Sequence, residues 1–196
     1  MKKIMFNDRY GLTEAVLSGR KTITRRLVPK SFFSTEHDIE DNNTLVFEDM
    51  YGGWHDIRES RYALKAGEIL AIAQAYKDFG AYCIDSRAMT NKMFVKAEYM
   101  PHQIRITNVR VEKLQDISDE DCIKEGVREV CVNNNWGNSA SHWEFQIPYE
   151  DKFGRTKLLR GTTPREVFAV LIDRISGKGT WDSNPFVFVY EFELVK

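Results

Sequence analysis

The sequence predicts a mixed α+β fold, a small β-barrel of mixed strand directions with helices at its ends. Several short segments have the composition of strands and few have helical spacing, and the two kinds do not alternate as a doubly wound sheet requires. Of the 196 residues, 42% are hydrophobic and 29% are charged, which is typical of a globular domain and excludes a largely disordered chain. We expect one domain over residues 1–196, with long insertions at about 31–65 and 131–160.

The first thirty residues predict two strands joined by a short helix. Lys2–Phe6 is rich in apolar residues and suits a strand. Thr13–Ser18 has the pattern of a short helix, and Gly19 follows it where a helix C-cap is expected. Lys21–Leu27 contains three consecutive β-branched residues and predicts the second strand.

The middle of the chain predicts two further strands and a short helix. Gly67–Ala75 is almost continuously apolar, and Ile104–Leu114 alternates apolar and charged residues. Asn108 interrupts that alternation, which indicates a β-bulge near this residue. Ser118–Asp121 has the pattern of a capped helix start, and Gly126 ends the helix.

The C-terminal part predicts one long helix and one central strand. Thr163–Glu166 combines a Thr cap, a Pro in the first turn and a Glu three residues after the cap. Helical spacing then continues to Gly177, and we expect Phe168 and Leu171 to face inward where this helix closes one end of the barrel. Phe186–Leu194 is apolar on both faces in its first half, which predicts a central strand.

Charge is segregated along the chain although the formal net charge is only −1. Residues 1–30 contain eight basic and two acidic residues, whereas residues 31–60 contain eight acidic residues and one basic residue. The basic block can form a local anion-binding face. Alternatively, the acidic block neutralises it in space.

Several functional classes are not indicated. Asp8 interrupts the start before an apolar signal region forms, and no run of about 18 apolar residues is present, so we expect a cytoplasmic protein without a membrane partner. Three cysteines do not indicate a disulfide framework. The four histidines are scattered, and residues 177–180 resemble a phosphate loop without its upstream Gly, so we expect no metal, no ATP site and no cofactor.

The most distinctive stretch is Gly-Arg-Lys-Thr-Ile-Thr-Arg-Arg at residues 19–26. It resembles the signature of the ASCH domain, a PUA-like β-barrel family associated with RNA. Further matches follow in the same order and together cover about half of the chain: Tyr99–Pro101, Arg105 and Val109–Leu114, then Asp116–Asp121 and Glu125–Val127, then Trp181, Asn184–Pro185 and Phe186–Leu194. The similarity is greatest to the longer ASCH proteins of phages and prophage regions.

The resemblance implies a domain that binds a nucleobase, a nucleoside or RNA in a basic cleft. Trp181 lies in a polar turn, so it is a better candidate for stacking on a base than the aromatic residues of the strand at 186–192, which are expected in the core. The other expected ligand contacts are basic or hydroxyl side chains, namely Arg20, Thr22, Arg25, Arg26 and Arg105. The alternative for these charges is a solvated strand edge.

A second possibility is an amidohydrolase that deacylates a modified nucleoside. Small ASCH enzymes that remove the acetyl group of N4-acetylcytidine have the same six residues as Gly19–Thr24 in their active-site segment. The resemblance implies Lys21 as proton acceptor, Thr24 as nucleophile and, by a looser alignment, Glu125 as proton donor. A Thr hydroxyl needs an adjacent base, and a Lys is that base only if its pKa is lowered. Residues 21 and 24 face opposite sides of a regular strand, so this mechanism requires a bend beside Gly19.

The chain also departs from those enzymes. They are about half as long, and Arg25 stands where they have an apolar residue before the Arg. Purely structural explanations of these residues remain open. Thr22 and Thr24 suit a strand through their β-propensity alone, and Glu125 can be a carboxylate on a helix surface. A third possibility is a phage accessory protein that binds a host protein through its insertions.

Overall fold

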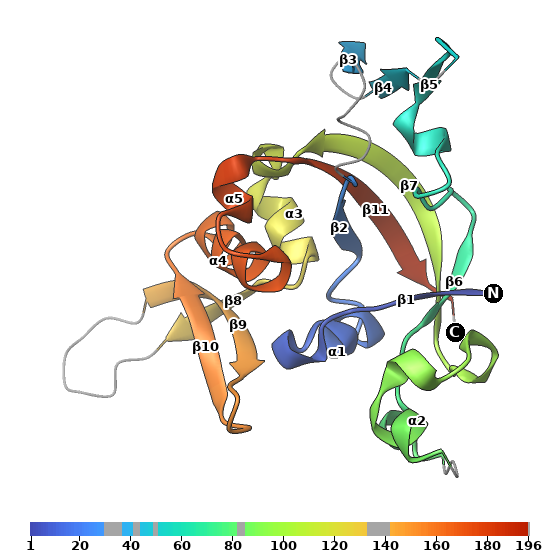
Figure 1. Cartoon of the computed structure of the whole chain (residues 1–196). Coiled ribbons are helices and arrows are strands. Elements are labelled where there is room, and N and C mark those ends of the chain that lie inside the picture. Colours follow the sequence, from blue (N-terminus) through green and yellow to red (C-terminus); the bar gives the residue numbers. More distant parts are fainter. Residues whose placement is uncertain (30–36, 41–43, 49–50, 82–84, 133–141, 196) are drawn as a thin grey trace.

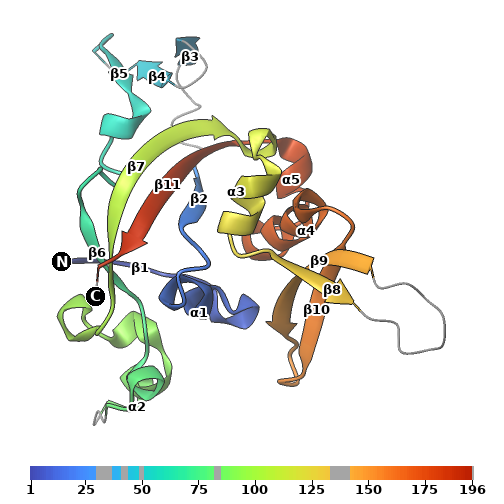
Figure 2. The ribbon, with the colours of Figure 1, turned by 180° about the vertical axis from the view of Figure 1, so that it is seen from behind.

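The computed structural model describes residues 1–29, 37–40, 44–48, 51–81, 85–132 and 142–195. Its main sheet has five strands in the order β1–β6–β7–β11–β2 (Figures 1 and 2). These strands are β1 (Lys2–Ile4), β6 (Ile69–Ile72), β7 (Gln103–Lys113), β11 (Phe186–Leu194) and β2 (Ile23–Leu27). Only β1 and β6 run parallel, and the other neighbours are antiparallel.

The expected central strand is confirmed. β11 lies between β7 and β2, and Val187 and Val189 are buried on one face while Phe188 and Tyr190 are buried on the other. The three predicted strands of the middle and C-terminal regions share one curved sheet (Figure 1). The pairing of β7 with β11 shifts register between Glu191 and Phe192, opposite Asn108, so the predicted bulge is also present.

The fold is α+β with more strand than helix, but the described strands do not form a closed barrel. β1 and β2 are the two edges of the main sheet, and no backbone ladder between described residues joins them. A side chain spans this opening instead: Arg26 of β2 donates from Nη2 to the carbonyl of Met5, just beyond β1. Closure of a small sheet requires a consistent tilt and stagger of all strands. Here β1 has only three residues, all of which pair with β6.

Helices are short except for one. The α-helices are α1 (Leu12–Leu17), α2 (Ser86–Thr90), α3 (Asp119–Lys124), α4 (Pro164–Ser176) and α5 (Thr180–Ser183). Single 3₁₀ turns cover Asp8–Tyr10, Ile57–Glu59, Tyr76–Phe79, Lys92–Phe94, Ala97–Tyr99 and Leu114–Asp116. α1, α3 and α4 agree with the predicted helices to within one or two residues at their ends.

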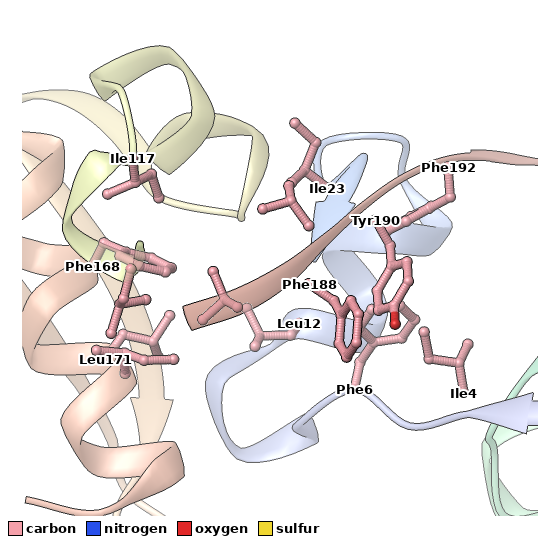
Figure 3. Packing of buried hydrophobic residues seen from close by; sticks show 14 of the residues in the cluster. Ile4, Phe6, Leu12, Ile23, Ile117, Phe168, Leu171, Phe188, Tyr190 and Phe192 are labelled. Carbon is pink, nitrogen blue, oxygen red and sulfur yellow. The ribbon is translucent and has the colours of Figure 1, made fainter. Parts of the chain in front are cut away.

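The predicted start of α4 is confirmed in detail. Thr163 accepts a hydrogen bond from the Glu166 amide at 3.2 Å, and the Glu166 carboxylate accepts one from the Thr163 amide at 3.3 Å. Phe168 and Leu171 are buried, as expected, and Figure 3 shows them pointing into the cluster that contains Phe188. α4 therefore presents a rigid apolar face toward the open side of the main sheet.

The two predicted insertions contain strands that the sequence did not indicate. One antiparallel sheet consists of β3 (His37–Glu40), β4 (Thr44–Glu48) and β5 (Trp54–Asp56). The other consists of β8 (Arg128–Val132), β9 (His142–Glu150) and β10 (Thr156–Gly161). The first projects from one end of the main sheet, and the second lies beside α4 (Figures 1 and 2). Residues of both contribute to the main hydrophobic cluster.

In the described part of the chain, no helix has the length and apolar character needed to cross a membrane. Cys122 and Cys131 form no disulfide with a described residue, and Cys83 lies outside the described residues. Burial raises the pKa of Cys122 to about 12.

The buried phenol of Tyr190 is expected to lower the stability of the folded protein at alkaline pH. Burial raises the pKa of its phenol from 10.0 to about 12, although the Leu64 amide donates to the hydroxyl at 3.2 Å. The unfolded chain then loses this proton first, so the free energy of unfolding falls between pH 10 and 12, by roughly 2–3 kcal/mol, and no further above that range.

Urea unfolding of wild type, Tyr190→Phe and Tyr62→Phe at pH 9, 10, 11 and 12 measures this effect. Tyr190→Phe should lose less stability than wild type over the range, whereas Tyr62→Phe removes the hydroxyl of an exposed tyrosine and should follow wild type. Parallel profiles for wild type and Tyr190→Phe would contradict the assignment.

Candidate functional site

The segment between α1 and β2 bends as the catalytic hypothesis requires. Gly19 has φ +73°, in the left-handed region that glycine tolerates. The amide of Lys21 donates to the carbonyl of Ala15 at 2.9 Å, which folds the chain back against α1. β2 begins only at Ile23. Lys21 therefore precedes the strand, and its side chain does not obey the strand alternation that would separate it from Thr24.

Lys21 is an internal lysine. It is 2% exposed, and its ammonium donates to the Ile23 carbonyl at 2.7 Å, to the Glu125 carbonyl at 2.9 Å and to the Glu125 carboxylate. Burial lowers the pKa of Lys21, and the nearby Glu125 carboxylate opposes this without cancelling it. All three ammonium protons have acceptors, so the buried charge is fully solvated by the protein.

Glu125 is not a helix-surface carboxylate but joins two buried cations. It follows α3 directly and is 4% exposed. One carboxylate oxygen accepts from Lys21, and the other accepts from Nη1 of Arg25 at 3.4 Å. The end of α3 thereby fastens the carboxylate against the start of β2.

Arg25 lines the cleft, as expected of a ligand contact, but the structure gives it a structural role as well, and its role toward a ligand stays a prediction. Its guanidinium is buried and its Nη2 donates to Glu112 at 2.6 Å and to Asp121 at 2.9 Å. Burial acts to lower the pKa of Arg25, but the carboxylates of Glu125 and Glu112 outweigh this and the pKa is raised. With its donors directed to carboxylates of the chain, Arg25 holds α3 against the sheet.

A cleft of about 690 Å³ lies at the opening between β1 and β2. One wall of the cleft is formed by the segment directly after β1, and the other wall is formed by α4. The floor is formed by Lys21, by residues of β2 and by Glu125. Lys21, Thr24 and Glu125 all line the cleft, so the three residues of the catalytic hypothesis share one cavity. The Thr24 hydroxyl makes no hydrogen bond within the described part of the chain, and no direct bond joins it to Lys21.

The two walls of the cleft differ in chemistry. α4 contributes an apolar surface from Phe168, Leu171, Ile172 and Ile175. The opposite side contributes cations, which are Arg9, Arg26 and Lys92. Arg26 is exposed, and its guanidinium lies 6.0 Å from the centre of the Phe6 ring. The sequence indicated Arg26 but not Lys92, because Lys92 lies in a region without a clear period.

Three of the predicted ligand contacts do not line this cleft. Arg20 pairs with Glu14 at 3.8 Å on the surface, and Thr22 lies in the turn before β2. Arg105 lies on an exposed position of β7 and pairs with Glu193 of β11 at 3.1 Å. These side chains point away because the turn and the strand alternation direct them to other faces.

Trp181 also lies outside the cleft. Its ring packs edge-on against Phe168, with centroids 6.3 Å apart, and the Arg165 guanidinium lies 5.2 Å from its centre. Both contacts anchor α5 to α4. The ring therefore serves packing between helices in this structure.

No ion pair between described side chains joins the basic block at 1–30 to the acidic block at 31–60. The described ion pairs of the basic block go to the carboxylates of Glu14 and Glu68 and to carboxylates within residues 112–125. No described group of three His, Cys, Asp or Glu side chains is arranged to hold a metal ion.

Comparison with family models, with curated proteins and with solved structures finds no match to this chain. The geometry of the cleft and the resemblance at residues 19–26 are thus the two sources for a functional proposal.

Proposed function

We propose that the cleft binds a nucleobase or nucleoside, free or within RNA, as in a PUA-like ASCH domain. The observation that supports this most is that the buried Lys21–Glu125 pair lines the same cleft as the Thr24 hydroxyl, which makes no hydrogen bond to a described residue. Binding sites for small molecules combine a largely apolar lining with a few polar groups that set orientation. The apolar side of α4 and the polar floor have this division.

Each wall has a role in this proposal. The α4 side chains contact the flat face of the base, and the Thr24 hydroxyl reaches a polar edge of it. Arg26 and Arg9 lie where they attract an anionic or strongly polar ligand. No described residue of 31–65 or 131–160 lines the cleft, so an interaction of these insertions with a host protein would use a different surface.

The chemistry of the floor supports a second candidate, deacylation of N4-acetylcytidine or a related nucleoside. A buried ion pair can move a proton from Lys21 to Glu125, because burial penalises both charges. That shift supplies a neutral amine as base and a protonated carboxyl as acid at once. Burial is the main cause that lowers the pKa of Lys21, and the charges of Arg26 and Arg25 act in the same direction, which favours the neutral amine.

The reaction then proceeds in two balanced halves. The Thr24 oxygen attacks the acetyl carbonyl carbon while its proton passes to Lys21, and Glu125 protonates the exocyclic nitrogen as the C–N bond breaks. This leaves an acetyl ester on Thr24 and restores the ion pair. Water then attacks the ester and gives a proton to Glu125, while Lys21 returns a proton to the Thr24 oxygen and acetic acid leaves.

Binding to the cleft is expected to depend on Arg26. Isothermal titration of wild type with cytidine, N4-acetylcytidine and a short single-stranded RNA should detect binding that weakens as salt rises for the RNA. Arg26→Glu should weaken RNA binding at least about tenfold, and because it also removes the hydrogen bond from Arg26 to the Met5 carbonyl, circular dichroism of the variant checks that the fold is kept. The same reversal at Arg25 is unsuitable as a test, because that side chain is buried among carboxylates.

Arg87→Glu is the matched control. Arg87 is exposed and lies 5.1 Å from the centre of the Phe94 ring, as Arg26 lies beside Phe6, but it does not line the cleft. It should bind as wild type does. Absence of binding to the nucleosides and to RNA, or an equal loss in both variants, would contradict the proposed function.

A further inference from the structure

A second cavity of about 510 Å³ continues the main cleft. The two share Leu27, at the end of β2, and Ser176, at the end of α4. Strands advance about 3.3 Å per residue, so Leu27 lies about 10 Å along β2 from Thr24. A ligand whose reactive end lies at Thr24 would thus extend toward Leu27 and enter the second cavity.

The second cavity is lined by cations without carboxylates. Lys113 of β7 and Lys178, after α4, both line it, whereas no Asp or Glu does. Neither ammonium forms an ion pair within the described part of the chain. The Lys113 ammonium lies 3.7 Å from the centre of the Phe186 ring, which holds it in place without neutralising it. These two charges are available to an anion.

The loop at residues 177–180 resembles a phosphate loop in sequence. It lines the second cavity with the Lys178 side chain, but it does not offer backbone amides to an anion there. The amides of Gly179 and Trp181 donate to the Asp173 carboxylate at 3.0 and 2.8 Å. An internal anion therefore already occupies the backbone donors of this turn. An external anion would meet the Lys178 ammonium instead.

The opposite end of the main cleft has the reverse character. A third cavity of about 320 Å³ adjoins it through Asp8 and Lys92. Its lining contains Glu14 and Asp78 in addition to Asp8, and these acids outnumber its lysines. A phosphate group is repelled at this end and attracted at the other.

We infer that the ligand of the main cleft carries a phosphate in the second cavity, so that the occupant is a nucleotide and not a free nucleoside. This inference rests on the proposed function and specifies its ligand class. The phosphate lies between the ammonium groups of Lys113 and Lys178, and the base lies against α4. A phosphomonoester and a phosphodiester of a strand share this chemistry.

Titrations of the full chain with cytidine, its 5′- and 3′-monophosphates and a single-stranded RNA hexamer test the inference. At least one phosphorylated ligand should bind wild type about tenfold or more tightly than cytidine. Lys113→Gln/Lys178→Gln should lose that gain while its affinity for cytidine stays within about twofold. The dependence of log K on log salt for the hexamer should become shallower by about 1.4, as expected for two lost phosphate contacts.

Lys96→Gln/Lys152→Gln is the matched control, because it removes two exposed lysines outside the cavities, one of which lies over a Phe ring. A gain with a monophosphate indicates a nucleotide, and a gain with the hexamer alone indicates a strand; both support the inference. Equal affinity for cytidine and every phosphorylated ligand would overturn the inference but not the proposed function. No binding of any ligand, cytidine included, would overturn both.

Discussion

Thr24→Ala is expected to abolish deacylation of N4-acetylcytidine while leaving nucleoside binding within about threefold of wild type. The substitution removes the only hydroxyl that the mechanism uses as nucleophile, and loss of such a group typically lowers kcat by about 10³-fold or more. Chromatography of the released cytidine, under single-turnover conditions, measures the rate. Thr24→Ser keeps a hydroxyl at the same position and should retain part of the activity.

Thr22→Ala is the control for this change. Thr22 is two residues away and has the same side chain, but it does not line the cleft, so its replacement should leave the rate nearly unchanged. Lys21→Met should also abolish the reaction, and Lys21→Met/Thr24→Ala should be no slower than either single variant, because the two groups act in one step. Full activity in Thr24→Ala would rule out the mechanism and leave the binding function alone.

Glu125→Gln is expected to lower the free energy of unfolding by about 3–5 kcal/mol, the usual cost of leaving a buried charge without its partner. The Lys21 ammonium would keep its two carbonyl acceptors but lose its only carboxylate. Lys21→Met should cost less, because Glu125 would still be paired with Arg25. From the sequence alone, Glu125→Gln is expected to impair turnover without affecting binding; the burial of Glu125 makes loss of stability its first consequence.

Urea unfolding of the variants tests this asymmetry. Lys21→Met/Glu125→Gln should be more stable than Glu125→Gln alone, because the double variant has no unpaired lysine charge. Glu120→Gln, at an exposed position of α3, should change the free energy of unfolding by less than about 0.5 kcal/mol. A cost below 1 kcal/mol for Glu125→Gln would show that the pair contributes little and that Lys21 is held by the carbonyls.

Local patterns in the sequence were sufficient for the five strands of the main sheet and for α1, α3 and α4. The capped start of α4 and the two-sided apolar run of β11 are properties of neighbouring residues, and both were predicted where they occur. The bulge opposite Asn108 was visible as a break in alternation. The strands at residues 37–56 and 128–161 were not predicted, because their apolar alternation is weak and their pairing depends on each other.

The sequence by itself determined that Lys21 and Thr24 lie at a helix-to-strand turn, since Gly19 and the β-branched residues specify that turn locally. It also indicated a possible carboxylate partner in Glu125, which lies about a hundred residues away. Only the tertiary structure decided that Lys21 and Arg25 both bind this carboxylate, that Arg26 stays at the cleft, and that Arg105 and Trp181 lie elsewhere. The direction of a side chain depends on which strands and helices pack around it, and those contacts join segments too distant for any local pattern to specify.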